Sequence, residues 1–254
     1  MALIKTEEEI KILREGGKRL AAIMLQLKKA VVVGISTNEL NALAEKLIRL
    51  EGDEPSILNY QPDGASYPFP ASACISINEE IVHGLPGERK IKDGDVVTFD
   101  FCLTRKNLVT DSATTVIVGE VDPKLKKLLE VTKMGLDAGI KAARPGNTLG
   151  DVGYAIESCA HPHGYGVVRE LGGHGVGHYV HEEPFIPNFG KPGRGLLLEP
   201  GMVLAIEPMF TLGSPKVEVK EDGYTIVSRD NSPSAHFEHT VAITKDGHKV
   251  LTAE

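Results

Sequence analysis

The stretch IKDGDVVTFDF, residues 91–101, has a counterpart in LEPGMVLAIEPMF, residues 198–210. In both stretches a glycine is followed by a run of mainly apolar residues, a pattern that predicts a buried strand. When the two stretches are aligned, Asp100 falls on Glu207. Each predicted strand therefore carries one carboxylate at its end.

A second pair of similar stretches follows in the same order. TDSATTVIV, residues 110–118, resembles FEHTVAIT, residues 237–244, and this alignment sets Asp111 against Glu238. Matches that recur in one order indicate a duplication, whereas a solenoid would need several shorter repeats. Each half of the chain is therefore expected to supply two carboxylates.

Helix signals accompany these β-rich segments in both parts of the chain. Three helix starts are marked by capping residues, and a shorter fourth helix is expected around residues 152–158. The caps are Thr6 with Glu9, Ser36 with Glu39, and Asp122 before Pro123. Strands are expected at residues 96–101, 114–118, 202–206, 224–227 and 240–244. The order of elements predicts one α+β domain, residues 1–254, with halves at approximately 1–120 and 121–254.

Length, charge and cysteine content narrow the class of protein. The chain has 254 residues, 41% of them hydrophobic, enough for a large core without disulfides. A net charge of −7 argues against a nucleic-acid binder. No apolar run approaches the ~18 residues of a membrane span, and the start MALIKTEEE lacks a signal-peptide core. Three cysteines without a CxxC motif favour the reducing cytoplasm.

Four carboxylates are expected to converge if the two halves pack face to face. Asp100, Asp111, Glu207 and Glu238 would then share one dry cleft, where they repel each other strongly. Either most of them are protonated or cations neutralise them, and two divalent ions balance four carboxylates. Asp100 taken alone could equally be a buried aspartate satisfied by backbone donors, but its match with Glu207 and its eleven-residue spacing to Asp111 favour a ligand.

One histidine is expected beside these carboxylates. In LGGHGVGH, residues 171–178, four glycines surround His174, so that backbone and ring can approach a metal closely. Four carboxylates and one histidine, with no thiolate, favour Mn, Fe(II) or Co over a structural zinc. Two such ions ~3.5–4 Å apart can activate a hydroxide that attacks a carbonyl. The remaining histidines of this region are expected to be loop residues: His161, His163 and His178. Cys102 and Cys159 are expected to be ordinary buried thiols.

These motifs resemble those of the type I methionine aminopeptidases, of the pita-bread metallopeptidase family. The resemblance is carried by SINEEIVHGLP, VVTFDF, the aspartate eleven residues on, GGHGVG, HEEP, AIEPM and FEHT, and it covers nearly the whole chain. It implies a pita-bread fold, in which two pseudo-symmetric halves form a central antiparallel sheet flanked by helices. The implied activity removes the N-terminal methionine from nascent polypeptides whose second residue is small.

The resemblance also implies the role of each metal ligand. Asp100 would chelate one metal, Asp111 and Glu238 would bridge both, and His174 and Glu207 would complete the other. Glu207 would also act as the general base that takes a proton from the attacking water. The implied cofactors are two divalent ions, which could be Mn, Fe(II), Co or Zn.

Substrate-binding residues follow from the same resemblance. His83, in IVHGLP, would contact the substrate near the scissile amide, and His181, in HEEP, would hydrogen-bond the scissile carbonyl or the developing oxyanion. The methionine pocket would include Tyr67, Phe69, Cys74 and Tyr224. The chain has no tryptophan, and Tyr224 stands where the family often has one. The implied partners are peptide N-termini, and the implied state is a monomer.

Two rival functions remain open at this point. An Xaa-Pro aminopeptidase or dipeptidase of the same fold would carry an additional domain ahead of the metal-binding part, whereas the matching sequence here begins near residue 6. A metal-free pita-bread binding protein would have lost ligands, and all five are present. Hydrolysis of Met-Ala-Ser but not of Xaa-Pro peptides would separate the favoured function from both.

Basic residues gather near the N-terminus. Lys5, Lys11, Arg14, Lys18 and Arg19 are expected to form a solvated face of the first helix. Contact with the ribosome through this face is a secondary hypothesis, which predicts an association that weakens with salt.

Overall fold

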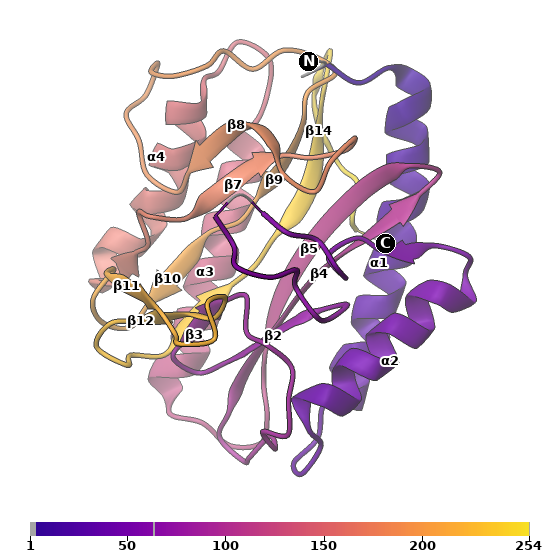
Figure 1. Cartoon of the computed structure of the whole chain (residues 1–254). Helices are drawn as coiled ribbons and strands as arrows, with labels where there is room; N and C mark the ends of the chain where they lie inside the picture. Colours follow the sequence, from indigo (N-terminus) through magenta and orange to yellow (C-terminus); the bar gives the residue numbers. More distant parts are fainter. Residues whose placement is uncertain (1–3, 63, 254) are drawn as a thin grey trace.

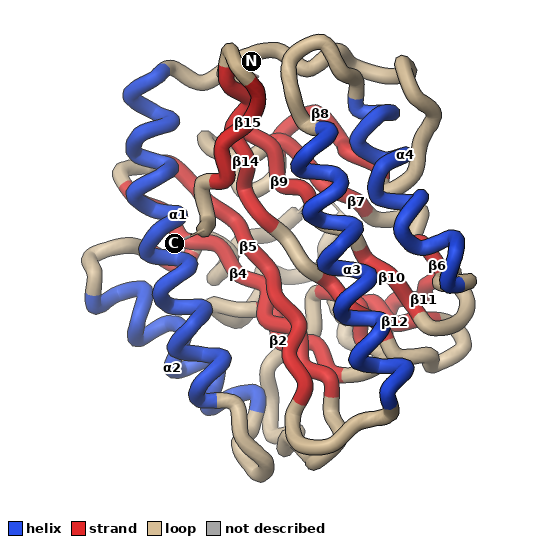
Figure 2. Tube along the Cα trace, turned by 180° about the vertical axis from the view of Figure 1, so that it is seen from behind, coloured by secondary structure: helices blue, strands red, loops and turns tan. Residues whose placement is uncertain are grey.

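The computed structural model describes residues 4–62 and 64–253. Four helices lie on one face of a set of twisted strands, and the opposite face is free of helices (Figures 1 and 2). The helices are α1 (Glu7–Ala30), α2 (Thr37–Leu50), α3 (Pro123–Ala142) and α4 (Leu149–Ala160). This α+β architecture confirms the predicted fold class. No helix of the described residues is long and apolar enough to cross a membrane.

The three predicted helix starts are confirmed, and the fourth helix begins earlier than expected. Thr6, Ser36 and Asp122 are the N-caps of the first three helices. The fourth helix starts at Leu149 because the carboxylate of Asp151 accepts hydrogen bonds from the backbone N–H and the hydroxyl of Thr148. Such a reciprocal cap stabilises the first turn of a helix.

All strand pairs of the described residues are antiparallel. The first part of the chain forms β1 (Glu54–Pro55), β2 (Cys74–Ile77), β3 (Glu80–Val82), β4 (Val96–Arg105) and β5 (Leu108–Ile117). The second part forms β6 (Gly166–Val167), β7 (Gly172–Gly175), β8 (Glu182–Pro187), β9 (Val203–Ile206), β10 (Met209–Thr211), β11 (Val217–Val219), β12 (Ile226–Ser228), β13 (Ser234–His236), β14 (His239–Thr244) and β15 (Gly247–Val250). The largest sheet has the strand order β15-β14-β9-β7-β8.

Strands β4 and β5, of ten residues each, form a hairpin that is longer than the sequence predicts. Lys106 and Asn107 connect the two strands with positive φ angles of 49° and 64°, as a tight two-residue turn requires. Because the hairpin extends to Arg105, Asp100 lies in the middle of a strand. The expectation that it marks a strand end is therefore wrong.

Side chains alternate between the two faces of each strand, so one face of the sheet packs into the core and the other faces the site. On β4, Phe99 and Phe101 are fully buried in an apolar cluster that includes Leu20 and Leu40 of the first two helices. Because side chains alternate along a strand, Asp100 faces the opposite side of the sheet, away from the helices. On β9 and β10, Ile206 and Phe210 belong to a second cluster, with residues of α3 and α4.

The basic residues near the N-terminus do not form a solvated face, contrary to expectation. Lys5 is buried and pairs with Glu182. Arg14 donates from Nη1 to the carbonyl oxygens of Leu251 and Ala253, and Arg19 pairs with Glu51 and Asp53. Only Lys11 and Lys18 of the five are exposed. Lys5, just ahead of the first helix, and Arg14 and Arg19 on it thus make intramolecular contacts.

Candidate metal centre

The β4–β5 hairpin brings two carboxylates to one face of the sheet. In its register Cys102 lies opposite Asp111, and Ala113 lies opposite Asp100. Asp100 and Asp111 are therefore diagonal neighbours on the same face. The spacing of eleven residues between them is a consequence of the tight turn and of this register.

Two further carboxylates come from the breaks between short strands of the second part of the chain. Ile206 pairs with His239, and Met209 pairs with His236. The register is the same on both sides of the break, so Glu207 lies opposite Glu238. Both carboxylates are buried.

Hydrogen bonds between β5 and the start of β14 join the two carboxylate pairs. The N–H of Glu238 donates to the carbonyl of Ala113 at 2.9 Å, and the hydroxyl of Ser112 donates to the carbonyl of Glu238 at 2.9 Å. The N–H of Asp111 donates to Oγ1 of Thr240 at 2.9 Å. These hydrogen bonds to the backbone groups of Asp111 and Glu238 hold the two residues beside each other.

His174 approaches these carboxylates from β7. Its Nδ1 lies 2.8 Å from the carbonyl oxygen of Gly175, so this nitrogen carries the proton and Nε2 presents a lone pair. Nε2 lies 3.9 Å from Oδ2 of Asp111 and 3.6 Å from Oε1 of Glu207. Asp111, His174 and Glu238 each offer a ligand atom, and these atoms lie within 4.8 Å of one another. Three of the five predicted ligands thus converge, and the other two flank them.

Burial raises the pKa values of all four carboxyl groups, and charge repulsion adds to this effect in three of them. Loss of solvation, followed by the charge of Asp111, raises the pKa of Asp100 to about 8. The pKa of Glu207 and that of Glu238 are raised well above their usual range, first by burial and then by the charge of Asp111. Burial also raises the pKa of Asp111. Ionised together, the four groups need positive charge among them.

Two observations fit a divalent metal at this centre. Oδ1 of Asp111 and Oε1 of Glu238 are buried without a hydrogen-bond partner among the described residues. Burial, with a smaller effect of the neighbouring His181, lowers the pKa of His174 to about 3, so its ring is neutral near pH 7. Oxygen donors and one neutral imidazole form a donor set that first-row divalent ions accept.

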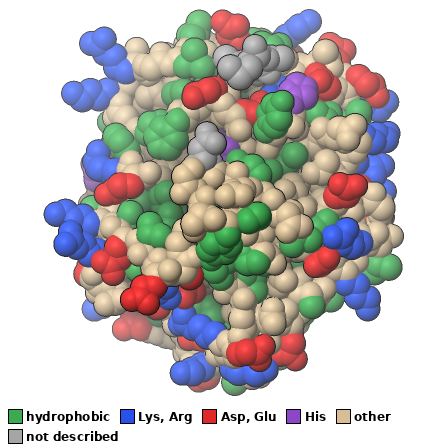
Figure 3. Space-filling model, viewed as in Figure 1, with side chains coloured by type: hydrophobic (Ala, Val, Ile, Leu, Met, Phe, Trp, Pro, Cys, Tyr) green, Lys and Arg blue, Asp and Glu red, His purple; other side chains and the backbone are tan. Residues whose placement is uncertain are grey.

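Two cavities meet at the centre on the face without helices. A small apolar pocket of about 70 Å³ is lined by Phe69, Cys74, Tyr224 and both hairpin aspartates. A larger cleft of about 580 Å³ opens to solvent. Figure 3 shows this face, where lysine and arginine side chains lie mainly along the rim. His83 and His181 line both cavities and therefore mark the passage between them.

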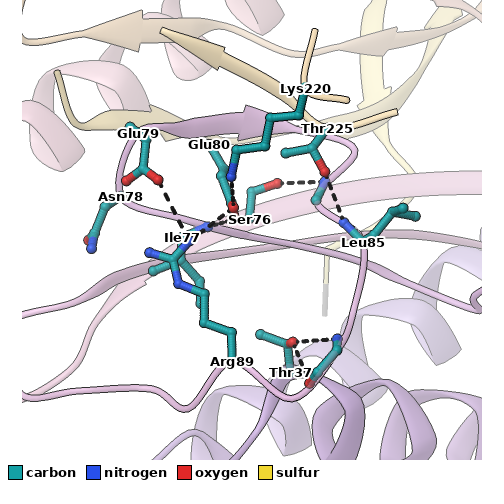
Figure 4. Close-up of polar contacts among 12 residues, drawn as sticks. Thr37, Ser76, Ile77, Asn78, Glu79, Glu80, Leu85, Arg89, Lys220 and Thr225 are labelled. Atoms are coloured by element: carbon teal, nitrogen blue, oxygen red, sulfur yellow. Dashed lines mark hydrogen bonds and ion pairs between the residues drawn. The ribbon is translucent and has the colours of Figure 1, made fainter. Parts of the chain in front are cut away.

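His83 directly follows strand β3, and Figure 4 shows the polar contacts around this strand. Oε1 of Glu80 pairs with Arg89 at 2.9 Å and with Lys220 at 2.6 Å, and Oε2 accepts from the N–H of Ile77. His83 itself has a φ of 57°, a strained value for a residue other than glycine. The Glu80 contacts tie this short strand to segments on either side of it, which holds the strained residue in place.

On the two sides of His83, further hydrogen bonds fix the chain. The N–H of Gly84 donates to Oγ of Ser76, and the N–H of Leu85 donates to Oγ1 of Thr225 (Figure 4). Burial, and to a smaller extent the charge of His181, lowers the pKa of His83 to about 4. His83 is therefore neutral near pH 7 and acts as a hydrogen-bond donor or acceptor.

A network at the N-terminus positions the loop that carries His181. The carboxylate of Glu182 accepts from the N–H groups of His178 and Tyr179 and pairs with Lys5. Oε1 of Glu9 lies 2.7 Å from Nε2 of His178. His178 thus takes part in a structural network with Glu9 and Glu182.

Two contacts orient the His181 ring itself. The hydroxyl of Tyr60 lies 3.2 Å from Nδ1, and the ring of His174 stands edge-on with centroids 4.6 Å apart. Burial lowers the pKa of His181. Its ring therefore projects between the metal centre and the small pocket in a neutral form.

The structure places all but one of the predicted site residues around one centre. Tyr67 does not line either cavity; its hydroxyl donates to the carbonyl of Asp222, and its ring packs edge-on against Tyr224. Cys74 lines the small pocket, and burial together with the nearby Asp100 raises the pKa of its thiol well above the usual range.

Sequence reasoning missed several residues of the site. Ile57, Tyr60 and Val180 line the small pocket, and no motif distinguishes the first two from ordinary loop residues. His236 lies 3.3 Å from Glu207. A signal for it was present, because alternate residues of an extended segment share a face and His236 precedes Glu238 by two.

The fold and this centre define a metallopeptidase of the pita-bread class. A family model described as metallopeptidase family M24 matches residues 11–245, and the chain belongs to this family. Among its relatives, methionine aminopeptidase 1 of Bacillus subtilis is 44% identical over 99% of both chains. Methionine aminopeptidase of Treponema pallidum is 45% identical over 99% of this chain and 96% of the relative.

Solved structures agree with this assignment. The crystal structure of methionine aminopeptidase from Rickettsia prowazekii superposes with a TM-score of 0.94 at 39% identity, over 98% of this chain and 99% of that one. A prolidase from Pyrococcus furiosus has a TM-score of 0.78 at 24% identity, and the match covers 99% of this chain but 66% of the prolidase. The prolidase likeness therefore shows the shared fold alone.

Proposed function

We propose that the chain is a methionine aminopeptidase that removes the N-terminal methionine from polypeptides whose second residue is small. The observation that carries this proposal is the junction at His83 and His181, where a small apolar pocket and an open cleft meet beside the metal centre. A methionine side chain, which is unbranched and flexible, suits the small pocket. The rest of the peptide would leave through the cleft, so the scissile bond would lie at the metals.

The proposed ligand set is Asp100, Asp111, His174, Glu207 and Glu238. Asp111 and Glu238 would each offer a metal a buried oxygen that has no hydrogen-bond partner among the described residues. When bound, such a pair of ions supplies Lewis acidity toward a carbonyl oxygen and toward water. Mn, Fe(II), Co and Zn all accept this donor set, and availability decides between them.

The proposed roles of the protein residues follow from their positions. Glu207 lines the open cleft and has a raised pKa, so it would accept and hold the proton that the attacking water loses. His181 would donate a hydrogen bond to the scissile carbonyl as negative charge develops on its oxygen. His83 would contact the peptide near the scissile amide. Phe69, Cys74 and Tyr224 would enclose the methionine side chain, with Tyr67 supporting Tyr224 from behind.

We further propose that the enzyme works as a monomer in the cytoplasm, on the N-termini of newly made chains. Its three cysteines are free, two of them buried, as in proteins of a reducing compartment. Every group of the proposed centre comes from one chain. A second copy is therefore not needed to complete the site.

The experiment that tests the proposed activity compares three peptides on one metal-loaded protein. With Mn(II) or Co(II), the protein should release methionine from Met-Ala-Ser, act poorly on Met-Leu-Ser and leave Xaa-Pro peptides intact. A bulky second residue would collide with the passage beside His83 and His181. Equal rates on the Xaa-Pro peptide would replace this proposal with a prolidase-type activity.

A further inference from the structure

His236 lies in the centre but has no role in the function proposed above. Its side chain is 1% exposed, and neither ring nitrogen has a hydrogen-bond partner among the described residues. A buried polar group without a hydrogen-bond partner costs free energy. The group that the His236 ring faces should therefore explain why a histidine is buried here. Its Nε2 faces Oε2 of Glu207 at a distance of 3.3 Å.

Both backbone polar groups of His236, the N–H and the carbonyl, are held by hydrogen bonds. Oγ1 of Thr115 accepts from the N–H of His236 at 2.9 Å and donates to its carbonyl oxygen at 2.7 Å. His236 also pairs with Met209 in the β10–β13 ladder. These contacts fix the backbone of His236, and the burial of its side chain limits the positions that the ring can take.

Glu207 is held in a similar way, and its two carboxylate oxygens face different partners. Its backbone carbonyl accepts from Nδ2 of the fully buried Asn188 at 2.9 Å. Oε1 lies 3.6 Å from Nε2 of His174, whereas Oε2 lies 3.3 Å from Nε2 of His236. One oxygen thus points to the ligand histidine and the other to a potential donor.

We infer that His236 is a positioning residue that holds Oε2 of Glu207, so that Glu207 presents Oε1 alone to a metal on the His174 side. The inference rests on the metal site proposed above. A hydrogen bond to one oxygen prevents the carboxylate from turning, and it disfavours binding of the metal through both oxygens. Outer partners of this kind typically change metal affinity or rate by ~10–100-fold.

The test compares His236→Leu with His236→Gln in the Co(II)-loaded protein. The leucine removes the donor, whereas the glutamine amide restores an N–H at a similar reach. We expect His236→Leu to weaken Co(II) binding in calorimetry by about 10–100-fold and to lower kcat on Met-Ala-Ser with little change in KM. Its Co(II) absorption spectrum should also change, because Glu207 can then bind through both oxygens. His236→Gln should restore affinity, spectrum and kcat.

His239→Leu is the matched control. It also removes an imidazole next to Glu238, although a half-buried one, and Nδ1 of His239 contacts Oγ1 of Thr252 at 2.9 Å instead of facing Glu207. The Co(II) spectrum of this variant should equal that of the wild type. Should His236→Leu fail to fold, His236→Asn replaces it, because its amide is too short to reach Oε2, and the same losses are expected.

Each contrary outcome has a distinct meaning. Wild-type protein that binds no Co(II) would overturn the proposed function itself. If the wild type binds Co(II) and cleaves the peptide, and His236→Leu has the same affinity, spectrum and kcat, only the positioning role is overturned. Equal losses in the leucine and glutamine variants would also overturn it, because the donor would then not be the cause.

Discussion

Asp111 is the residue on which most contacts of the centre depend. Its backbone N–H donates a hydrogen bond to Oγ1 of Thr240, and its side chain lies diagonally from Asp100. Its Oδ2 lies 3.9 Å from Nε2 of His174. Its charge also contributes to the raised pKa values of the other three carboxyl groups. A ligand in this position connects both parts of the chain through the metals.

Asp111→Asn should therefore abolish activity and metal binding together. The amide keeps the size of the side chain but removes the negative charge and one oxygen ligand. Metal content per chain, measured by atomic emission, should fall along with the rate on Met-Ala-Ser. His181→Ala is the control: it should keep the metals and lose rate, because His181 is not a ligand. Full activity of Asp111→Asn would contradict the ligand assignment.

At the scale of elements, α1 packs closely against the C-terminal segment. A Cβ added at Gly17 would lie 2.2 Å from the backbone oxygen of Leu251, and one added at Gly16 would meet side-chain atoms of Leu103 and Thr110 at 3.3 Å. Side chains can adjust by a few tenths of an ångström, whereas a hydrogen-bonded backbone moves less readily. Gly17 thus allows the first helix to approach the end of the chain.

We expect Gly17→Ala to lower the free energy of unfolding by about 1–3 kcal/mol, as overpacking typically does. This loss would outweigh the gain of ~1 kcal/mol that alanine provides in a helix. In Gly16→Ala the same gain roughly offsets the milder crowding, so its stability should stay within ~1 kcal/mol of the wild type. Urea unfolding of both variants measures the difference. Equal stabilities would show that α1 can shift away from Leu251.

At the scale of the whole molecule, the buried carboxylates oppose folding when no metal is bound. Above about pH 4 the unfolded chain has ionised carboxyl groups, while the folded chain keeps Asp100 protonated up to its pKa of about 8. The unfolded state then binds fewer protons than the native state, so the free energy of unfolding decreases as pH rises. The lowered pKa of His83, about 4, has the opposite effect, but only below about 6.5.

The metal-free protein should therefore lose stability between pH 7 and 8.5. Asp100 alone would contribute a decrease of roughly 1 kcal/mol over this interval, and Glu207 and Glu238 act in the same direction. The metal-loaded protein should show a flatter profile, because the ions stabilise the ionised carboxylates. Urea unfolding with a chelator and with Mn(II) tests this. Metal-free stability that stays level or rises would show that the carboxyl groups are not repelling each other.

The sequence by itself determined the local structure, the family and the candidate ligands. Caps at Thr6, Ser36 and Asp122 are local signals, because a cap bonds only to the turn that follows it. The ligands were recognised from short motifs around Asp100, His174 and Glu238, and the duplication of the chain stays a prediction.

Only the tertiary structure decided which distant side chains meet. The approach of His236 to Glu207, the pocket wall from Tyr60 and the burial of Lys5 depend on the packing of segments far apart in the chain. The charge of the carboxyl groups was also decided there, since burial and neighbours move a pKa and neither is a property of the residue alone. Periodicity shows which face of an element a residue occupies, but packing determines what that face meets.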